Sequence, residues 1–210
     1  MKLDAVVYTV AGMAFGVILG WLIGSQQLGR TATVPAAAPV QQSAAPAAGP
    51  AGGRTPPALD QAKVDQLTTA INGDPKNTTA IVQLANVYFD AERFTDAISW
   101  YEKAIAIDPK NADVSTDLGV SYYYTNRTDE ALKRFEESLK INPKHTKTLL
   151  NKGIVLAFGK EDLKGAAAEW QKVVDLAPTS PEGEAARRAL EGVAAAAKQH
   201  ETATQPAATP

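Results

Sequence analysis

The chain of 210 residues contains no cysteine, which excludes disulfide bonds, thiolate metal sites and a cysteine nucleophile. It also lacks an excess of charge of either sign, with 21 Lys and Arg against 23 Asp and Glu. No run of basic residues is present to neutralise phosphates, so nucleic acid is not an expected partner.

Motifs for catalysis and cofactor binding are missing as well. The sequence contains no glycine-rich phosphate loop, no HExxH zinc motif and no calcium-binding loop. Of the two histidines, His145 lies beside Lys144 and Lys147, and His200 lies near the C-terminus. Neither has a neighbouring ligand or triad partner in the sequence, so we expect solvated imidazoles. We therefore predict no catalytic residues, no metal, no cofactor and no enzyme activity.

Charge is also absent from Ala5 to Gly24, and this stretch is apolar. About 20 apolar residues are needed for a helix to cross a bilayer. A cleavable signal peptide would have an apolar core of roughly 7 to 15 residues, and a buried core helix would show a polar face. We therefore predict that residues 1–30 form an N-terminal transmembrane anchor, with a cleaved signal as the alternative.

Glycines follow a fixed step inside this stretch, at Gly12, Gly16, Gly20 and Gly24. A step of four residues advances about 400° around a helix, so the four glycines form one continuous strip. Small residues in such strips allow transmembrane helices to approach closely. The strip predicts self-association or docking on another transmembrane helix.

The orientation of the anchor depends on a small difference in flanking charge. Lys2 and the amino terminus lie on one side of the stretch, and Arg30 lies on the other. We expect the short end in the cytoplasm, which places the rest of the chain on the periplasmic side of an inner membrane. A cytoplasmic-facing domain is the alternative.

Two segments are too poor in large apolar residues to form a core. Residues 31–57 are rich in Ala, Pro and Gly, with Arg54 as their charged residue, and residues 200–210 have a similar composition. Both are predicted to be disordered, and the first would act as a linker that reaches about 30 Å as a coil. The folded domain is therefore expected between residues 58 and 199.

Prolines recur in that domain with a nearly constant period. Pro75, Pro109, Pro143 and Pro178, which follow Asp, Asp, Asn and Ala, recur at intervals of 34, 34 and 35 residues. A period of about 34 residues closed by proline is typical of the tetratricopeptide repeat, whose pattern is W-x2-L-G-x2-Y, then A-x3-F, then P. Three repeats match it, with Leu84, Ala85, Tyr88, Ala97 and Tyr101; Leu118, Gly119, Tyr122, Ala131 and Phe135; and Gly153, Leu156, Ala166 and Trp170.

The sequence therefore resembles the tetratricopeptide repeat family. The predicted fold is an all-α helix-turn-helix solenoid with repeats at 78–111, 112–145 and 146–180, capped by helices at 58–73 and 181–198. Val64, Leu67 and Ile71 form the apolar stripe of the first cap, and Ser180 is the expected N-cap of the second. The second cap is alternatively a partner-binding helix. A residue inserted in the turn of the third repeat predicts a looser turn there.

The resemblance also implies a binding surface. In this family the first helix of each repeat lines a concave groove that binds peptides. Members that clamp a terminal carboxylate have Lys and Asn at two of these positions; Asn86 is present here, but Val82 replaces the Lys. The groove residues implied are Val82, Asn86, Phe89, Thr116, Val120, Tyr123, Tyr124, Leu150, Ile154 and Phe158. Packing of the aromatic residues against neighbouring helices is the alternative.

These features together predict a membrane-tethered adaptor that binds a partner protein or peptide. The sequences AAAEWQKVVDLAP and SPEGEAARRALEGV also resemble membrane-anchored factors of c-type cytochrome maturation, which implies a role there or in other envelope assembly. The alternative is a structural protein that self-associates through its glycine strip and solenoid.

Overall fold

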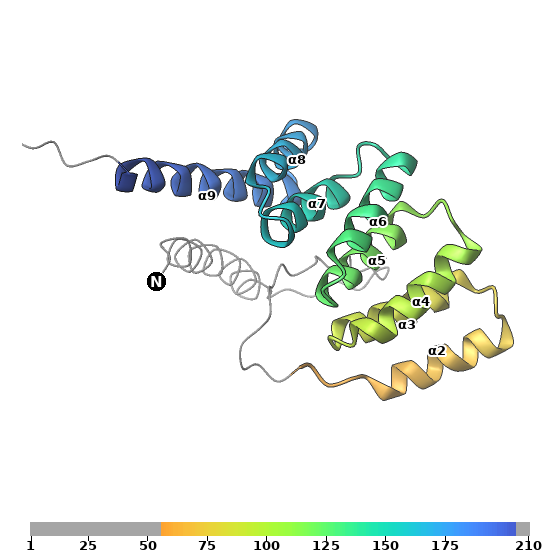
Figure 1. Ribbon diagram of the computed structural model, residues 1–210. Helices are drawn as coiled ribbons and strands as arrows, with labels where there is room; N and C mark the ends of the chain where they lie inside the picture. The colour runs from red at the N-terminus through yellow and green to blue at the C-terminus, as the bar shows by residue number, and fades with distance from the viewer. Residues whose placement is uncertain (1–55, 205–210) are drawn as a thin grey trace, which may run out of the picture. The chain divides into compact units, whose positions relative to one another are not determined.

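A computed structural model describes residues 56–204, which form helices joined by short turns and include no strand. The chain divides into two compact units, and residues 49–190 form one of them. This unit contains seven complete helices and the start of an eighth (Figure 1). The rest of the eighth helix belongs to the other unit. The helices are α2 (Gln61–Gly73), α3 (Thr78–Asp90), α4 (Phe94–Ile107), α5 (Ala112–Tyr124), α6 (Thr128–Ile141), α7 (Thr146–Gly159), α8 (Leu163–Leu176) and α9 (Pro181–Thr204).

Short turns of similar sequence separate the helix pairs. Asp74 and Asp108 accept hydrogen bonds from the backbone N–H two residues later, at 3.1 and 3.2 Å. Asn77 and Asn111 then cap α3 and α5 by accepting from the N–H three residues later, each at 3.0 Å. Because proline cannot continue a helix, each turn ends one pair and begins the next.

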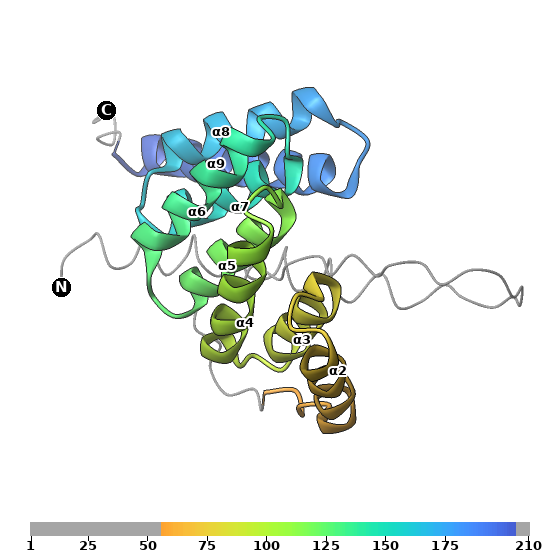
Figure 2. The same ribbon diagram turned by 90° about the vertical axis from the view of Figure 1, so that its right-hand side faces the viewer.

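The helices pack as three antiparallel pairs, α3 with α4, α5 with α6 and α7 with α8, that follow one another along the chain (Figures 1 and 2). Small residues allow close approach within each pair. A Cβ atom added to Gly119 would lie 2.6 Å from Cε1 of Phe135. Gly153 lies in the same way against the indole of Trp170, which is fully buried. The expected solenoid and the role of its small residues are therefore confirmed.

The turn inside the third repeat differs from our expectation. All three intra-repeat turns are three residues long, and their middle residues, Glu92, Asn126 and Glu161, have positive φ angles of 57°, 61° and 57°. The inserted residue instead lengthens α7 to 14 residues, compared with 13 in α3 and α5. The extra residue is absorbed because a helix extends without changing the turn that follows it.

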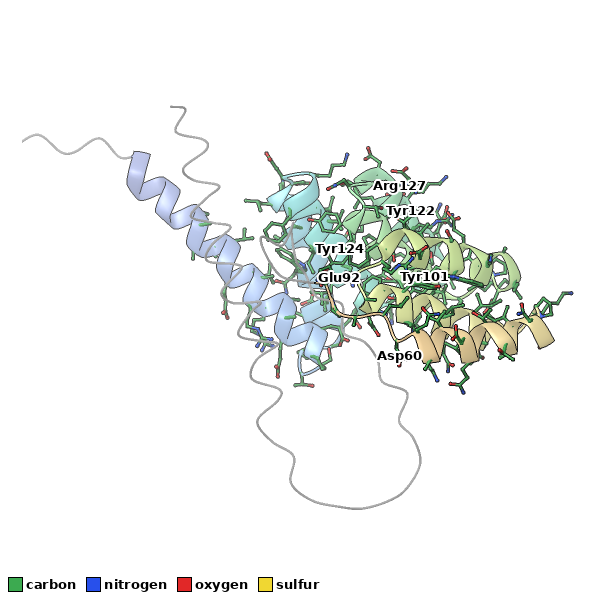
Figure 3. The ribbon with its side chains drawn as sticks, turned by 90° about the horizontal axis from the view of Figure 1, so that it is seen from below. Asp60, Glu92, Tyr101, Tyr122, Tyr124 and Arg127 are labelled. Carbon is green, nitrogen blue, oxygen red and sulfur yellow. The ribbon has the colours of Figure 1, made fainter. Side chains whose placement is uncertain are left out.

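Helices flank the repeats at both ends. Asp60, labelled in Figure 3, caps α2, whose Val64 and Leu67 are buried against Ala80 and Leu84 of α3. Ile71 is partly buried in the same cluster. At the other end, the hydroxyl of Ser180 accepts a hydrogen bond from the N–H of Gly183 at 3.1 Å, as expected of an N-cap. Helix α9 continues to Thr204, beyond the predicted end at residue 198.

The predicted transmembrane anchor, its glycine strip and most of the linker lie outside the described residues. Among the helices that the structure describes, none is long and apolar enough to span a membrane.

Candidate functional site

The ten residues predicted to line a groove all lie on α3, α5 and α7, the first helices of the three repeats. We call this set the first-helix face. Its members differ widely in exposure. Phe158 is 44% exposed, whereas Thr116 and Val120 are 0% and 4% exposed. The remaining seven side chains are half-buried. The structure therefore buries Thr116 and Val120, and the others retain surface that a partner can contact.

Aromatic rings gather where α3 and α5 end. The rings of Phe94 and Tyr124 stack at 4.4 Å between centroids, and Phe89 contacts both edge-on at 5.2 and 6.0 Å. Tyr123 lies 6.1 Å from Tyr124 (Figure 3 labels Tyr124). We call these four residues the aromatic cluster. Such ring pairs contribute about 0.5 to 1.5 kcal/mol beyond their buried area, so the cluster also joins the first repeat to the second.

Phe94 was not among the predicted residues, because it is the first residue of α4, a second helix. Its ring reaches the first-helix face since the three-residue turn brings the start of α4 beside the end of α3. The signal in the sequence was its position directly after that turn. The sequence left open whether these aromatic side chains pack against neighbouring helices. Phe89 and Tyr124 do so in part, because both contact Phe94 of α4.

Asn86 has a structural partner. Its side-chain oxygen accepts a hydrogen bond from the Tyr101 hydroxyl at 2.6 Å (Figure 3 labels Tyr101). Burial, together with the charges of Asp117 and Asp90, raises the pKa of Tyr101 well above its ordinary value. The tyrosine therefore stays neutral and keeps donating to Asn86. Replacing Asn86 would leave a buried hydroxyl without an acceptor.

Thr116 belongs to a buried group of hydroxyls that joins α5, α6 and α7. Its oxygen lies 3.0 Å from that of Ser138 and 2.6 Å from that of Thr148, and all three side chains are fully buried. Thr116 and Ser138 both donate to the carbonyl of Ala112, at 2.7 and 2.9 Å. We call these three residues the hydroxyl network. Thr116 thus connects the second and third repeats.

His145 is not solvated, contrary to the expectation from sequence. Its Nδ1 lies 2.6 Å from the Thr148 hydroxyl and its Nε2 lies 3.1 Å from a carboxylate oxygen of Asp113. The expectation was wrong because Asp113 is 32 residues away in sequence and is brought close by the packing of α5 on α7. The imidazole extends the hydroxyl network to the surface.

Acidic side chains accompany these residues. Asp117 on α5 pairs with Lys147 on α7 at 2.6 Å, and its side chain is 23% exposed. Burial raises the pKa of Asp117, and the nearby Lys147 partly opposes that rise. Asp90, the last residue of α3, is exposed, but neighbouring atoms exclude part of the water around its carboxyl and raise its pKa.

The third repeat contributes Leu150, Ile154 and Phe158. The carbonyl of Leu150 accepts a hydrogen bond from Nε1 of Trp170 at 3.2 Å, which fixes α8 on α7. No group of three or more His, Cys, Asp or Glu able to hold a metal ion occurs within residues 56–204. The first-helix face offers apolar, aromatic and acidic contacts, which suit the binding of a peptide segment.

Two sequence profiles, both described as tetratricopeptide repeat, match residues 77–144 and 116–181. Together they span residues 77–181, half of the chain. The chain therefore belongs to the tetratricopeptide repeat family, whose domains generally mediate protein–protein interactions. No curated protein is detectably similar to it.

Solved structures of the same fold come from several sources. The first such domain of human RPAP3 is 23% identical, covers 61% of this chain and 98% of its own, and has a TM-score of 0.54. The Sgt2 domain from Aspergillus fumigatus is 20% identical, with coverages of 63% and 87% and a TM-score of 0.55. A structure of the first TPR of Spaghetti (RPAP3) contains the HSP90 peptide SRMEEVD; it is 22% identical, with coverages of 60% and 96% and a TM-score of 0.53. At these identities the likeness establishes the fold alone.

Proposed function

We propose that the chain is an adaptor that binds a segment of a partner protein on its first-helix face. The observation that carries this proposal is the row of partly exposed aromatic and apolar side chains on α3, α5 and α7, which ends at Phe158, 44% exposed. Aromatic side chains bury large areas on binding and lose little conformational entropy, so such a surface favours peptide recognition.

The fold supports the same mode of binding. A related domain, the first of RPAP3, binds an HSP90 peptide. By analogy, this chain would bind its partner as an extended or helical segment laid across the three first helices. Val82, where a carboxylate clamp has Lys, argues against recognition of a terminal carboxylate.

We further propose that residues 5–24 tether the adaptor to an inner membrane and that residues 31–57 let the domain search its surroundings on the periplasmic side. The length of the uncharged stretch and the Ala- and Pro-rich composition that follows support this part of the proposal. Assembly of envelope protein complexes, including c-type cytochrome maturation, is the role that such an arrangement would serve.

Site-specific photo-crosslinking in native membranes tests the proposal. A photoreactive amino acid replaces Phe158 in the full-length chain, and a matched variant carries it at Leu163, which is 46% exposed at the start of α8. We expect one heterologous protein to crosslink at position 158 and not at 163. The Phe158→Ala chain, with another face position labelled, should lose that crosslink while its melting temperature stays near wild type.

Two results would contradict the proposal. Equal crosslinking at positions 158 and 163 would show that the first-helix face is not the contact surface. A product with twice the mass of the chain would instead support the alternative function, a self-associating scaffold, which the glycine strip of residues 12–24 favours.

A further inference from the structure

The first helices of the repeats have an uneven distribution of charge. Helices α3 and α5 contain no Lys or Arg at all, although they contain Asp90, Asp113 and Asp117. Helix α7 contains two lysines, and both already pair with carboxylates. Lys147 bonds to Asp117 at 2.6 Å, and Lys152 bonds to Glu169 at 3.1 Å. Once these pairs are formed, the face retains acidic groups and no unpaired ammonium.

Two carboxylates stay available on this face. Asp113 is 68% exposed, and one of its carboxylate oxygens lies 3.1 Å from Nε2 of His145. Asp90 is exposed, and no ion pair within the described part of the chain includes it. It is the last residue of α3 and follows Phe89, a member of the aromatic cluster, in sequence.

A cation placed near Asp90 would gain from three sources. It would meet the carboxylate, the negative end of the α3 helix dipole, and the faces of nearby aromatic rings. Two arginines already make contacts of this kind within the chain: Arg93 lies over the ring of Tyr88 and Arg127 over that of Tyr122, at 5.2 and 4.3 Å from the ring centroids.

We propose that the segment bound on the first-helix face is cationic, with apolar or aromatic side chains flanked by Lys or Arg, and that acidic segments are excluded. This inference depends on the proposed function, since it specifies the partner of the same face. An acidic peptide such as SRMEEVD, the ligand in the RPAP3 structure, would bring its carboxylates toward Asp90 and Asp113 and find no unpaired lysine.

Three synthetic peptides test the charge preference. They share one pattern of Leu and Phe, have amidated C-termini, and carry only Lys, only Gln or only Glu at their polar positions. Binding to the full-length chain in an uncharged detergent is measured by fluorescence anisotropy, with empty micelles as the blank. We expect the Lys peptide to bind at least about tenfold tighter than the Gln peptide, with no measurable binding of the Glu peptide. The difference in affinity between the Lys peptide and the Gln peptide should shrink as salt rises from about 20 to 200 mM.

Matched variants locate the effect. The double variant Asp90→Asn with Asp113→Asn should bring the affinities for the Lys and Gln peptides to within about threefold of each other. Glu136→Gln removes one negative charge from an exposed site on α6, a second helix, and should leave the ratio unchanged.

Each outcome decides between the two proposals. Equal binding of all three peptides, or preference for the Glu peptide, overturns the inference about charge and leaves the binding face intact. Glu136→Gln could also lower the ratio of the affinities for the Lys and Gln peptides as much as the double Asp variant does. That result would mean that the overall charge of the protein, and not this face, attracts the peptide, and it would overturn the inference as well. Binding of none of the peptides, together with no crosslink at position 158, would overturn the proposed function itself.

Discussion

At the scale of single residues, Gly153 shows how tightly each helix pair is packed. A Cβ atom at this position would lie 2.6 Å from Cδ1 of Trp170, whose indole is held by its hydrogen bond to Leu150. We therefore expect Gly153→Ala to lower the free energy of unfolding by about 1 to 3 kcal/mol, because a buried ring cannot move aside without strain. Urea denaturation of the full-length chain followed by circular dichroism measures the change.

Gly73 offers the control for this substitution. It is the last residue of α2, and a Cβ atom added there meets nothing within 4 Å. Gly73→Ala should be neutral or stabilising by up to about 1 kcal/mol, since alanine restricts the unfolded chain more than glycine does. Equal effects of the two substitutions would mean that helix propensity, not contact with Trp170, sets the requirement at position 153.

Glu169 makes stability depend on pH. Burial raises its pKa, but hydrogen bonds from Lys172 and Lys152, at 2.9 and 3.1 Å, lower it by more, so the folded-state pKa lies below the ordinary 4.5. The stability that the ionised form contributes is thus present above pH 4.5 and is lost as the pH falls through the folded-state value. Glu169→Gln should unfold at lower urea than wild type at about pH 7, with the gap closing near about pH 3. A gap of constant size would contradict the linkage; exposed Glu136→Gln is the control.

At the scale of helices, the hydroxyl network joins the second repeat to the third. Thr148 lies 2.6 Å from Thr116, 2.8 Å from Ser138 and 2.6 Å from His145. Thr148→Val keeps the shape of the side chain but removes the hydroxyl that Thr116, Ser138 and His145 contact. Because these buried polar groups would then have fewer hydrogen-bond partners, we expect a loss of about 1 to 3 kcal/mol in the free energy of unfolding.

The exposed Thr79 of α3 is the matched control, and Thr79→Val should change stability by less than about 0.5 kcal/mol. Urea denaturation again provides the measurement. If Thr148→Val is as well tolerated as Thr79→Val, the network is not what stabilises the contact of α5 with α7.

The same helices show what sequence can predict. The period of the prolines located every repeat, and Ser180 marked the start of α9 because a cap acts over only three residues. The contacts of Phe94 with Tyr124 and of His145 with Asp113 were not predictable, since they join different helices and depend on how the pairs pack. For the same reason, sequence placed Thr116 on a binding surface, whereas packing of three helices buries it.

At the scale of the whole molecule, the remaining question is whether the chain acts singly or in pairs, and the glycine strip outside the described residues predicts self-association or docking on another transmembrane helix. Replacing Gly16 and Gly20 by Ile would prevent the close approach of two helices in the bilayer. We expect the double variant to lose the dimer that chemical crosslinking detects in membranes, while it still fractionates with them. Ala14→Ile adds the same bulk about 200° away from Gly12 around the helix, and it should preserve the dimer. A dimer that survives the double variant would have to form through the tetratricopeptide domain.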